Sequence, residues 1–548
     1  MTTSRWTPVS LLFPGTSRLE RGLRGLALLV FLLAAAGWIL WERMGPAGIE
    51  AAYNGQSFSM VNLYVGLHRG LDPEGRTVAY FLENGMPVVR RLCGIIMVLA
   101  LALWLLGGRL KAQRHRYFSA TAAPENLAFF RIAIFATLLF YTDLPNVLLF
   151  SGFPRELQVA PPGWGVLLSV LPVNPTTAAV AGGLFLWVCG MALMGLYTRV
   201  SATLAVIVGL YVLGIPQFYG KIDHYHHLLW FAALLAASPC ADAWSVDAWL
   251  KKKRGLPAAA QTAQRYAVPL RFVWLLMGVI YFFAGFWKFV IGGLDWGAGE
   301  NLIYILYAQW YRVDWLPFFR IDEVPWLAAV AGVGVMFWEM GFIFLVLSRR
   351  TRWIAVAGGL LFHASVYLLA HINFWNLVAC YAAFVPVGAL LKRSQEVVAT
   401  QPPHRSPAHM VGSVLLAVNI FCGFTLLDTW PVAVYPTFAG VKEPLQATLS
   451  LEADLPDGTT VALIPWRREA LREAIGASRM LGLVWQVVRA SPGQERQQRA
   501  RAVLAVMKPY IPELEQAVAV RLYQDYVAVA PARWKEPPVR RMLIVVVE

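Results

Sequence analysis

The 548-residue sequence is poor in charged residues, which make up 14% of it, whereas hydrophobic residues make up 58%. A water-soluble protein carries about a quarter charged residues. The shortage therefore argues against a set of soluble domains and predicts a polytopic membrane protein. The formal net charge of +15 does not indicate a nucleic-acid partner, because Lys and Arg occur in short runs between apolar segments, as membrane topology requires.

Cysteine and the common active-site motifs are also scarce or missing. The five cysteines lie in or beside apolar segments and show neither CxxC pairs nor Cys/His metal spacing, so no disulfide framework and no zinc site is indicated. The chain lacks GxGxxG, Walker A, GxSxG and HExxH motifs. Nucleotide binding and the common hydrolase reactions therefore have no support.

Apolar runs long enough to cross a bilayer, which takes about 20 residues, are plentiful. About eleven of them predict an all-α polytopic membrane protein. The first run continues past AAAG to Trp41, so we interpret it as an uncleaved anchor rather than a signal peptide. The runs cover residues 25–43, 88–107, 127–150, 176–196, 200–219, 225–241, 269–291, 326–348, 352–371, 373–391 and 409–428.

The basic residues between the runs predict the orientation. If eleven helices alternate, these clusters fall on one side, which the positive-inside rule places in the cytoplasm with the N-terminus. The C-terminal region then lies in the periplasm or outside the cell, beyond a cell (inner) membrane. Arg90 and Arg91 are the exception, in a segment that we interpret as amphipathic. The cytoplasmic clusters are Arg18, Arg21, Arg24, residues 109–116, Arg199, residues 251–254, residues 349–352, Lys392 and Arg393.

The C-terminal region, residues 429–548, has a different pattern. LQATLSLEADLPDGTTVALIPW alternates apolar and polar residues around an Asp-Gly turn, which predicts a hairpin. Two helical patterns follow, and residues 517–531 and 540–548 indicate strands. We therefore expect a small extramembrane α+β domain. It shows no chemical motif, and we interpret Trp466 and its flanking arginines as ordinary surface.

Ionisable residues gather near the outer ends of the central runs. The segment GKIDHYHHLLW (220–230) enters the sixth run, and Lys288 lies inside the seventh run, in YFFAGFWKF. An ammonium group among apolar side chains is disfavoured. Lys288 is therefore either a neutral amine that acts as a general base, or a side chain that extends to the headgroups or to Asp295. Both interpretations stay open.

The histidines also admit two interpretations. His363, inside the ninth run, is either functional or hydrogen-bonded to a neighbouring helix, and His371 lies at the outer end of that run. His224 and His227 share a helical face, but no carboxylate follows at helical spacing, so we expect no metal there. Asp223 either orients a histidine or caps the sixth helix.

The segment KIDHYHHLLWFAALLAASPCADAWSVDAWL (221–250) resembles part of the vitamin K-dependent γ-carboxylases and their bacterial relatives. These proteins share the HTTM (horizontally transferred transmembrane) domain. Counting back from the WSVD tetrapeptide places the family's histidine on His224 and its usual asparagine on Asp223. YFFAGFWKF is similar to the stretch that carries the family's catalytic lysine, here Lys288. The resemblance covers the residues from about 125 to 392. Within this range, FFRIAIF (129–135) and LFHASVYLLAHINFWNLVACYAAFVP (361–386) also resemble segments of the family.

The resemblance implies a lyase in which Lys288, assisted by His224, deprotonates reduced vitamin K or another lipophilic quinol. The quinol would react with O2 to give an epoxide-forming alkoxide that takes the γ-proton from a peptide or protein glutamate, and CO2 would add to the carbanion. The lipid bilayer and a water-excluding pocket would protect so strong a base. No metal or nucleotide is implied. The expected supporting residues are Asp223, His227, His363 and His371.

Some features depart from the family pattern. Two extra runs precede the resembling region, and Asp223 replaces the asparagine, so quinone chemistry is better supported than peptide carboxylation. The alternative is a non-enzymatic membrane module, such as an immunity or sensing component, and a transporter has less support because no internal repeat is visible. The expected domains are an N-terminal two-helix extension (1–124), an HTTM/carboxylase-like membrane domain (125–392), a linker with the last helix (393–428) and an extracytoplasmic α+β domain (429–548).

Overall fold

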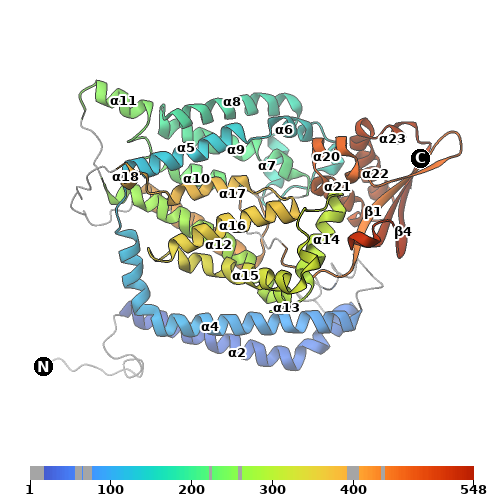
Figure 1. The fold of residues 1–548 in the computed structure, drawn as a ribbon, viewed down its shortest axis with the longest axis horizontal. Coiled ribbons are helices and arrows are strands. Elements are labelled where there is room, and N and C mark those ends of the chain that lie inside the picture. Colours follow the sequence, from blue (N-terminus) through green and yellow to red (C-terminus); the bar gives the residue numbers. More distant parts are fainter. Residues whose placement is uncertain are drawn as a thin grey trace. The chain divides into compact units, whose positions relative to one another are not determined.

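The structure is a computed structural model that describes residues 18–55, 65, 77–220, 222, 225–256, 262–391, 406–432 and 438–548. These residues are mostly helical, with one small antiparallel sheet near the C-terminus (Figure 1). Eight of the described helices are long and apolar enough to cross a membrane, or nine if one bent helix pair forms a single span. The chain is therefore a membrane-embedded protein.

Two long N-terminal helices form one unit together with residues Trp287–Gly293. They pack along each other, and Arg90 binds both carboxylate oxygens of Glu42. Arg91 donates to the carbonyl oxygen of Ile291 at 2.7 Å. The two arginines that break the charge pattern therefore bind partners inside this unit. The helices are α2 (Arg18–Tyr53) and α4 (Val78–Phe118).

The second unit begins at Ser119 and contains the remaining helices and the sheet. Its membrane part consists of α5 (Pro124–Phe140), α6 (Leu144–Ser151), η1 (Arg155–Leu157), α7 (Gly165–Val170), α8 (Pro175–Met194), α9 (Thr198–Val212), η2 (Ile215–Phe218), α10 (His227–Ala236), α11 (Val246–Lys253), α12 (Gln264–Gly292), α13 (Asp295–Ala298), α14 (Asn301–Val313), η3 (Ile321–Glu323), α15 (Pro325–Leu345), α16 (Arg352–Ala370), α17 (Trp375–Ala379), η4 (Cys380–Phe384), α18 (Val387–Leu390) and α19 (Pro407–Thr425). The last turn of α12 is counted with the N-terminal unit.

Three of the eleven expected spans are not single long helices. The run at 127–150 bends by 48° between α5 and α6, where Asp143 caps a new helix with Pro145 in its first turn. Helix α10 has ten residues and ends shortly before Pro239, and η4 ends shortly before Pro386. A proline disfavours the helical conformation of the residue that precedes it. The expected number of eleven spans is therefore not confirmed.

Helix α12 is the most buried of the candidate membrane spans. In its most apolar window 83% of the residues are buried, against 56% or less in each of the other seven. A helix that is apolar on all sides belongs in the interior of a bundle. Helix α12 carries Lys288, so this residue lies on the most enclosed span in the described part of the chain.

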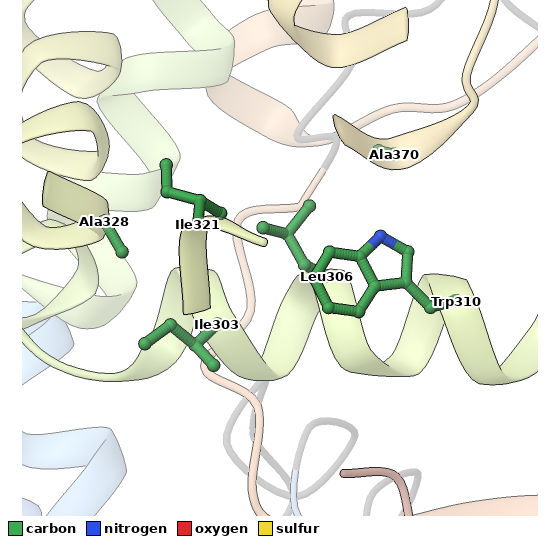
Figure 2. Packing of buried hydrophobic residues seen from close by; sticks show 6 residues of the cluster. All are labelled: Ile303, Leu306, Trp310, Ile321, Ala328 and Ala370. Carbon is green, nitrogen blue, oxygen red and sulfur yellow. The ribbon is translucent and has the colours of Figure 1, made fainter. Parts of the chain in front are cut away.

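Helix α14 is anchored to the neighbouring spans by a buried cluster. Figure 2 shows the indole of Trp310 on α14 directed toward the end of α16. The Trp310 Nε1 donates to the Leu369 carbonyl oxygen at 2.6 Å. This contact holds the C-terminal end of α14 beside the C-terminal end of α16. The cluster consists of Ile303, Leu306, Trp310, Ile321, Ala328 and Ala370.

The C-terminal domain is an antiparallel sheet in the order β2-β1-β3-β4 with helices packed on it (Figure 1). The first two strands turn at Gly458, whose φ of +84° suits glycine, at the expected Asp-Gly position. Trp466 is 1% exposed, so its interpretation as surface is wrong. The elements are β1 (Leu445–Asp454), β2 (Thr460–Leu463), η5 (Pro465–Arg467), α20 (Glu469–Ile475), α21 (Ala477–Arg489), α22 (Gln494–Met507), η6 (Lys508–Tyr510), α23 (Pro512–Gln516), β3 (Ala519–Ala528), η7 (Pro531–Arg533) and β4 (Arg540–Val547).

Candidate functional site

One face of α12 carries both Tyr281 and Lys288, which are separated by two helical turns. Lys288 is 4% exposed, so its side chain lies inside the protein and not on its outer surface. Gly285 lies between them on this face. A Cβ added there would lie 2.8 Å from the Met336 carbonyl oxygen and 2.9 Å from the Cβ of Glu339 on α15. The absence of a side chain at Gly285 thus lets α15, with its buried carboxylate, approach this face of α12.

A buried chain of three polar side chains starts from Tyr281. Its hydroxyl lies 2.6 Å from His363 Nε2 on α16 and 2.9 Å from the hydroxyl of Tyr381 on η4. A Cβ at Gly359 would lie 1.7 Å from the Tyr381 hydroxyl, so only glycine lets that hydroxyl reach Tyr281. His363 is thus hydrogen-bonded to a neighbouring helix, as one interpretation of the sequence allowed. Its Nδ1 has no hydrogen-bond partner among the described residues.

Aromatic rings surround this hydrogen-bonded chain. The ring centroids of Trp338 and Phe342 lie 4.9 and 4.7 Å from that of Tyr281, and Phe362 lies 5.2 Å from His363. The ring centroid of Phe374 lies 5.6 Å from that of His363. Such an apolar enclosure excludes water and strengthens the hydrogen bonds inside it.

The histidines at the start of α10 are buried as well. His226 and His227 are 0% and 1% exposed, and the His226 ring lies 4.9 Å from that of Trp230. The expected His224 and Asp223 lie outside the described residues. The structure therefore gives no geometry for the pairing of His224 with Lys288, and both keep the roles of expected site residues.

His371 is separate from the chain around His363. It is exposed, ends α16 with a φ of +52°, and its ring lies 5.0 Å from that of Trp315. The two histidines are eight positions apart, which is about 12 Å along a helix. The structure thus brings His363 together with Tyr281, and it brings His371 together with the end of α14.

The WSVD tetrapeptide has a structural task in the described fold. The Asp247 carboxylate accepts from the amides of Tyr197 and Thr198 at 2.9 and 2.8 Å, and so caps the start of α9. Ser245 caps α11 through the Ala248 amide. The first four amides of a helix have no partner within the helix, and capping side chains of this kind accept hydrogen bonds from them.

A buried arginine holds the same tetrapeptide in place. Arg131 on α5 is 0% exposed and donates to the carbonyl oxygens of Cys240 and Trp244 at 2.8 and 2.5 Å. The tetrapeptide follows the end of α10, whereas His226 and His227 lie at its start. The WSVD motif, from which the position of His224 was inferred, therefore has a structural role at the opposite end of α10. We call the contacts of Arg131, Ser245 and Asp247 at this motif the WSVD clasp.

Sequence reasoning did not single out Tyr281, Tyr381, Glu339 or Arg131 as site or clasp residues. For Glu339 and Arg131 a signal exists, because a charged side chain inside an apolar run is unusual and marks a specific contact. For the two tyrosines it does not, because their pairing depends on the packing of α12 against η4. Among the described residues, no group of three or more His, Cys, Asp or Glu side chains could hold a metal ion.

Comparison with known proteins gives one match. The family model of the HTTM domain matches residues 118–387. No curated protein and no solved structure matches the chain. The matched region contains the buried face of α12, the chain from Tyr281 to His363 and the WSVD clasp. Residues 118–387 of this membrane protein are therefore an HTTM domain.

Proposed function

We propose that the chain is a carboxylase-type membrane enzyme in which Lys288 takes a proton from a hydroxyl of reduced vitamin K or another lipophilic quinol. The observation that carries the proposal is the burial of Lys288, which is 4% exposed on the most enclosed candidate span. A lysine that reached for the lipid headgroups would show an exposed end. In this proposal the Lys288 amine is the general base.

The surroundings of Tyr281 and His363 support a quinol as the substrate that is oxidised. The aromatic rings around them suit a flat apolar ring, and a quinol hydroxyl would supply the hydrogen bond that His363 Nδ1 lacks among the described residues. The Tyr281 hydroxyl holds the His363 ring through Nε2 and so directs Nδ1. The enclosure would keep water away from the reacting groups.

The quinol, when bound, supplies the reaction with O2 that generates a base strong enough to remove a γ-proton of a glutamate, to which CO2 then adds. The acceptor in this proposal is a peptide or protein glutamate. His224 would assist Lys288, and Asp223 and His227 would support His224. The alternative, a non-enzymatic immunity or sensing module, needs neither Lys288 chemistry nor a quinol.

The test uses the full chain in lipid nanodiscs with reduced vitamin K, O2, isotopically labelled CO2 and a glutamate-containing peptide. We expect quinone epoxide and labelled peptide from the wild type. Lys288→Ala should lower both by about 100-fold or more, since a positioned general base contributes about 100- to 10,000-fold. Lys508→Ala, at an exposed position of the C-terminal domain, is the matched control and should keep full activity.

Two results would contradict the proposal. One is a wild-type protein that forms no epoxide and no labelled product above Lys288→Ala with several quinols and peptides. The other is a Lys288→Ala variant that folds and retains wild-type turnover. Separate assays of epoxide and label distinguish a quinol oxidase that does not carboxylate from a complete carboxylase.

The orientation belongs to the same proposal. The basic clusters support a cytoplasmic N-terminus and a C-terminal domain in the periplasm or outside the cell, in a cell (inner) membrane. The five native cysteines of the chain are all buried, so a single cysteine placed at exposed Lys508 reports on the side of the C-terminal domain. Labelling of intact cells by a membrane-impermeant maleimide is expected. Labelling only after lysis would show that the C-terminal domain lies in the cytoplasm and would contradict this orientation.

A further inference from the structure

A cavity of about 520 Å³ lies between the membrane part and the C-terminal domain. One wall is the end of α14 with Asp314 and Trp315, together with His371 at the end of α16. The other wall is the end of α20 and the start of α21, with Arg472 and Arg479. The cavity is separate from the chain around His363, and the proposed function does not use it.

The cavity is mainly cationic among the described residues that line it. Arg472 and Arg479 face one carboxylate, Asp314, which is exposed and lies 3.9 Å from Arg467. Arg472 is held by a 3.0 Å hydrogen bond from its Nη1 to the Val313 carbonyl oxygen. Arg479 donates to the Tyr225 hydroxyl at 3.2 Å. Both guanidinium groups are therefore positioned by the fold and do not hang freely in solvent.

The start of α21 adds hydrogen-bond donors to this cationic wall. Gly476 precedes the helix with a φ of +86° and provides no side-chain cap, and Ala477 and Ser478 line the cavity. The first amides of a helix favour an anion. Arg312 donates to the Ser478 hydroxyl at 3.2 Å, which places another positive charge behind this end of the helix.

The opposite wall has the character of a membrane interface. His371 ends a candidate membrane span, and the Trp315 ring lies against it. Directly after Trp315 the chain exposes Leu316, Phe318 and Phe319 before the next candidate span begins at Pro325. Tryptophan and exposed apolar residues at the ends of spans are typical of the headgroup level.

We propose that this cavity binds the phosphate of an anionic phospholipid headgroup. Arginine pairs and helix amides recognise phosphate through several directed hydrogen bonds, which is the donor set that the cavity presents. The apolar loop from Leu316 to Phe319 would contact the adjoining acyl chains. The lipid would thereby bridge the C-terminal domain and the ends of α14 and α16.

The test is native mass spectrometry of the full chain in detergent, with dioctanoyl phosphatidylglycerol and dioctanoyl phosphatidylcholine as probes. We expect the anionic lipid to bind at least about tenfold more tightly, because a hydrogen bond between charged groups contributes about tenfold or more to binding. Arg472→Gln and Arg479→Gln should each weaken the anionic lipid by about tenfold. Arg489→Gln, at the exposed far end of the same helix, is the matched control and should leave binding unchanged.

Thermal unfolding of each variant without added lipid shows whether it folds. If the glutamine variants do not fold, Arg472→Lys and Arg479→Lys, which retain the charge, replace them. Equal binding of the two lipids would overturn the proposal, as would an equal loss in Arg489→Gln. Inorganic phosphate is a third probe. If it binds as tightly as phosphatidylglycerol and displaces it, the cavity is a site for free phosphate and the lipid assignment is wrong. These measurements do not depend on quinol oxidation, so the two proposals fail separately.

Discussion

The most direct test of the buried site is removal of the Tyr281 hydroxyl. This hydroxyl lies at the centre of the chain, 2.6 Å from His363 Nε2 and 2.9 Å from the Tyr381 hydroxyl. Tyr281→Phe leaves both partners without it. A buried group that loses its partner costs about 1–3 kcal/mol, whereas hydrogen bonds inside membrane proteins average about 0.6 kcal/mol. For the two lost hydrogen bonds together we therefore expect a loss of about 1–4 kcal/mol in the free energy of unfolding.

Tyr381→Phe removes one hydrogen bond from the same chain and should cost about 1 kcal/mol. Because the two hydroxyls share that bond, the losses in the double variant should fall short of the sum of the single losses by about 0.5 kcal/mol or more. The assay is reversible unfolding in mixed detergent micelles, followed by circular dichroism. Tyr304→Phe, whose hydroxyl donates to the Glu300 carboxylate in an exposed hydrogen bond, is the matched control and should change stability by less than about 0.5 kcal/mol.

Strict additivity of the two substitutions would refute the shared hydrogen bond. A Tyr281→Phe loss no larger than that of the Tyr304→Phe control would refute the buried chain altogether. If the chain also positions His363 for a quinol, Tyr281→Phe should lower epoxide formation even in detergent conditions where the variant remains fully folded. An unchanged epoxide rate would show that the Tyr281 hydroxyl stabilises the fold and takes no part in catalysis.

Three further predictions concern packing, capping and charge. Gly359→Ala should lower the free energy of unfolding by about 1–3 kcal/mol, because its Cβ would overlap the Tyr381 hydroxyl, whereas Gly183→Ala, with open space around it, should be neutral or stabilising; equal effects would contradict this. Asp247→Ala should cost about 1–2 kcal/mol in the same unfolding assay by leaving the start of α9 uncapped, and no loss would contradict the clasp. Burial and a neighbouring arginine lower the pKa of Lys442, so the unfolded chain binds more protons above that lowered pKa and stability rises with pH there. Replacement by methionine should stabilise the protein at neutral pH and flatten this rise in unfolding measured against pH, and an unchanged slope would contradict the assignment.

The apolar runs predicted most of the membrane helices, because the hydrophobic length of a span is a local property of the sequence. They failed where a local break interrupts a run that still looks long enough. At 127–150 the break is the cap at Asp143 beside Pro145, and at the two other sites it lies near Pro239 and Pro386. These prolines are visible in the sequence, and hydropathy alone gives them too little weight. The hairpin at Gly458 was predictable for the opposite reason, since its turn residues act locally.

The site was less predictable, because its contacts join residues that are far apart in the chain. The unusual position of Lys288 in an apolar run was visible, and its burial agrees with one of the two interpretations that the sequence left open. The contact between Tyr281 and His363 spans 82 residues and depends on how α12 and α16 pack. No spacing rule encodes such a contact. The resemblance to the carboxylases identified the right domain and could not say which polar residues touch.

The structure gives different surroundings to two features by which the sequence resembles the family, the WSVD tetrapeptide and Lys288. The WSVD tetrapeptide is bound by Arg131 and caps α9, so its presence in this chain can be explained by folding alone. Lys288 is an ionisable side chain that is 4% exposed on the most enclosed candidate span of the described residues. An ionisable residue inside a membrane span is costly and indicates a functional site. This contrast is why the proposal rests on Lys288 and not on the motif by which the domain is recognised.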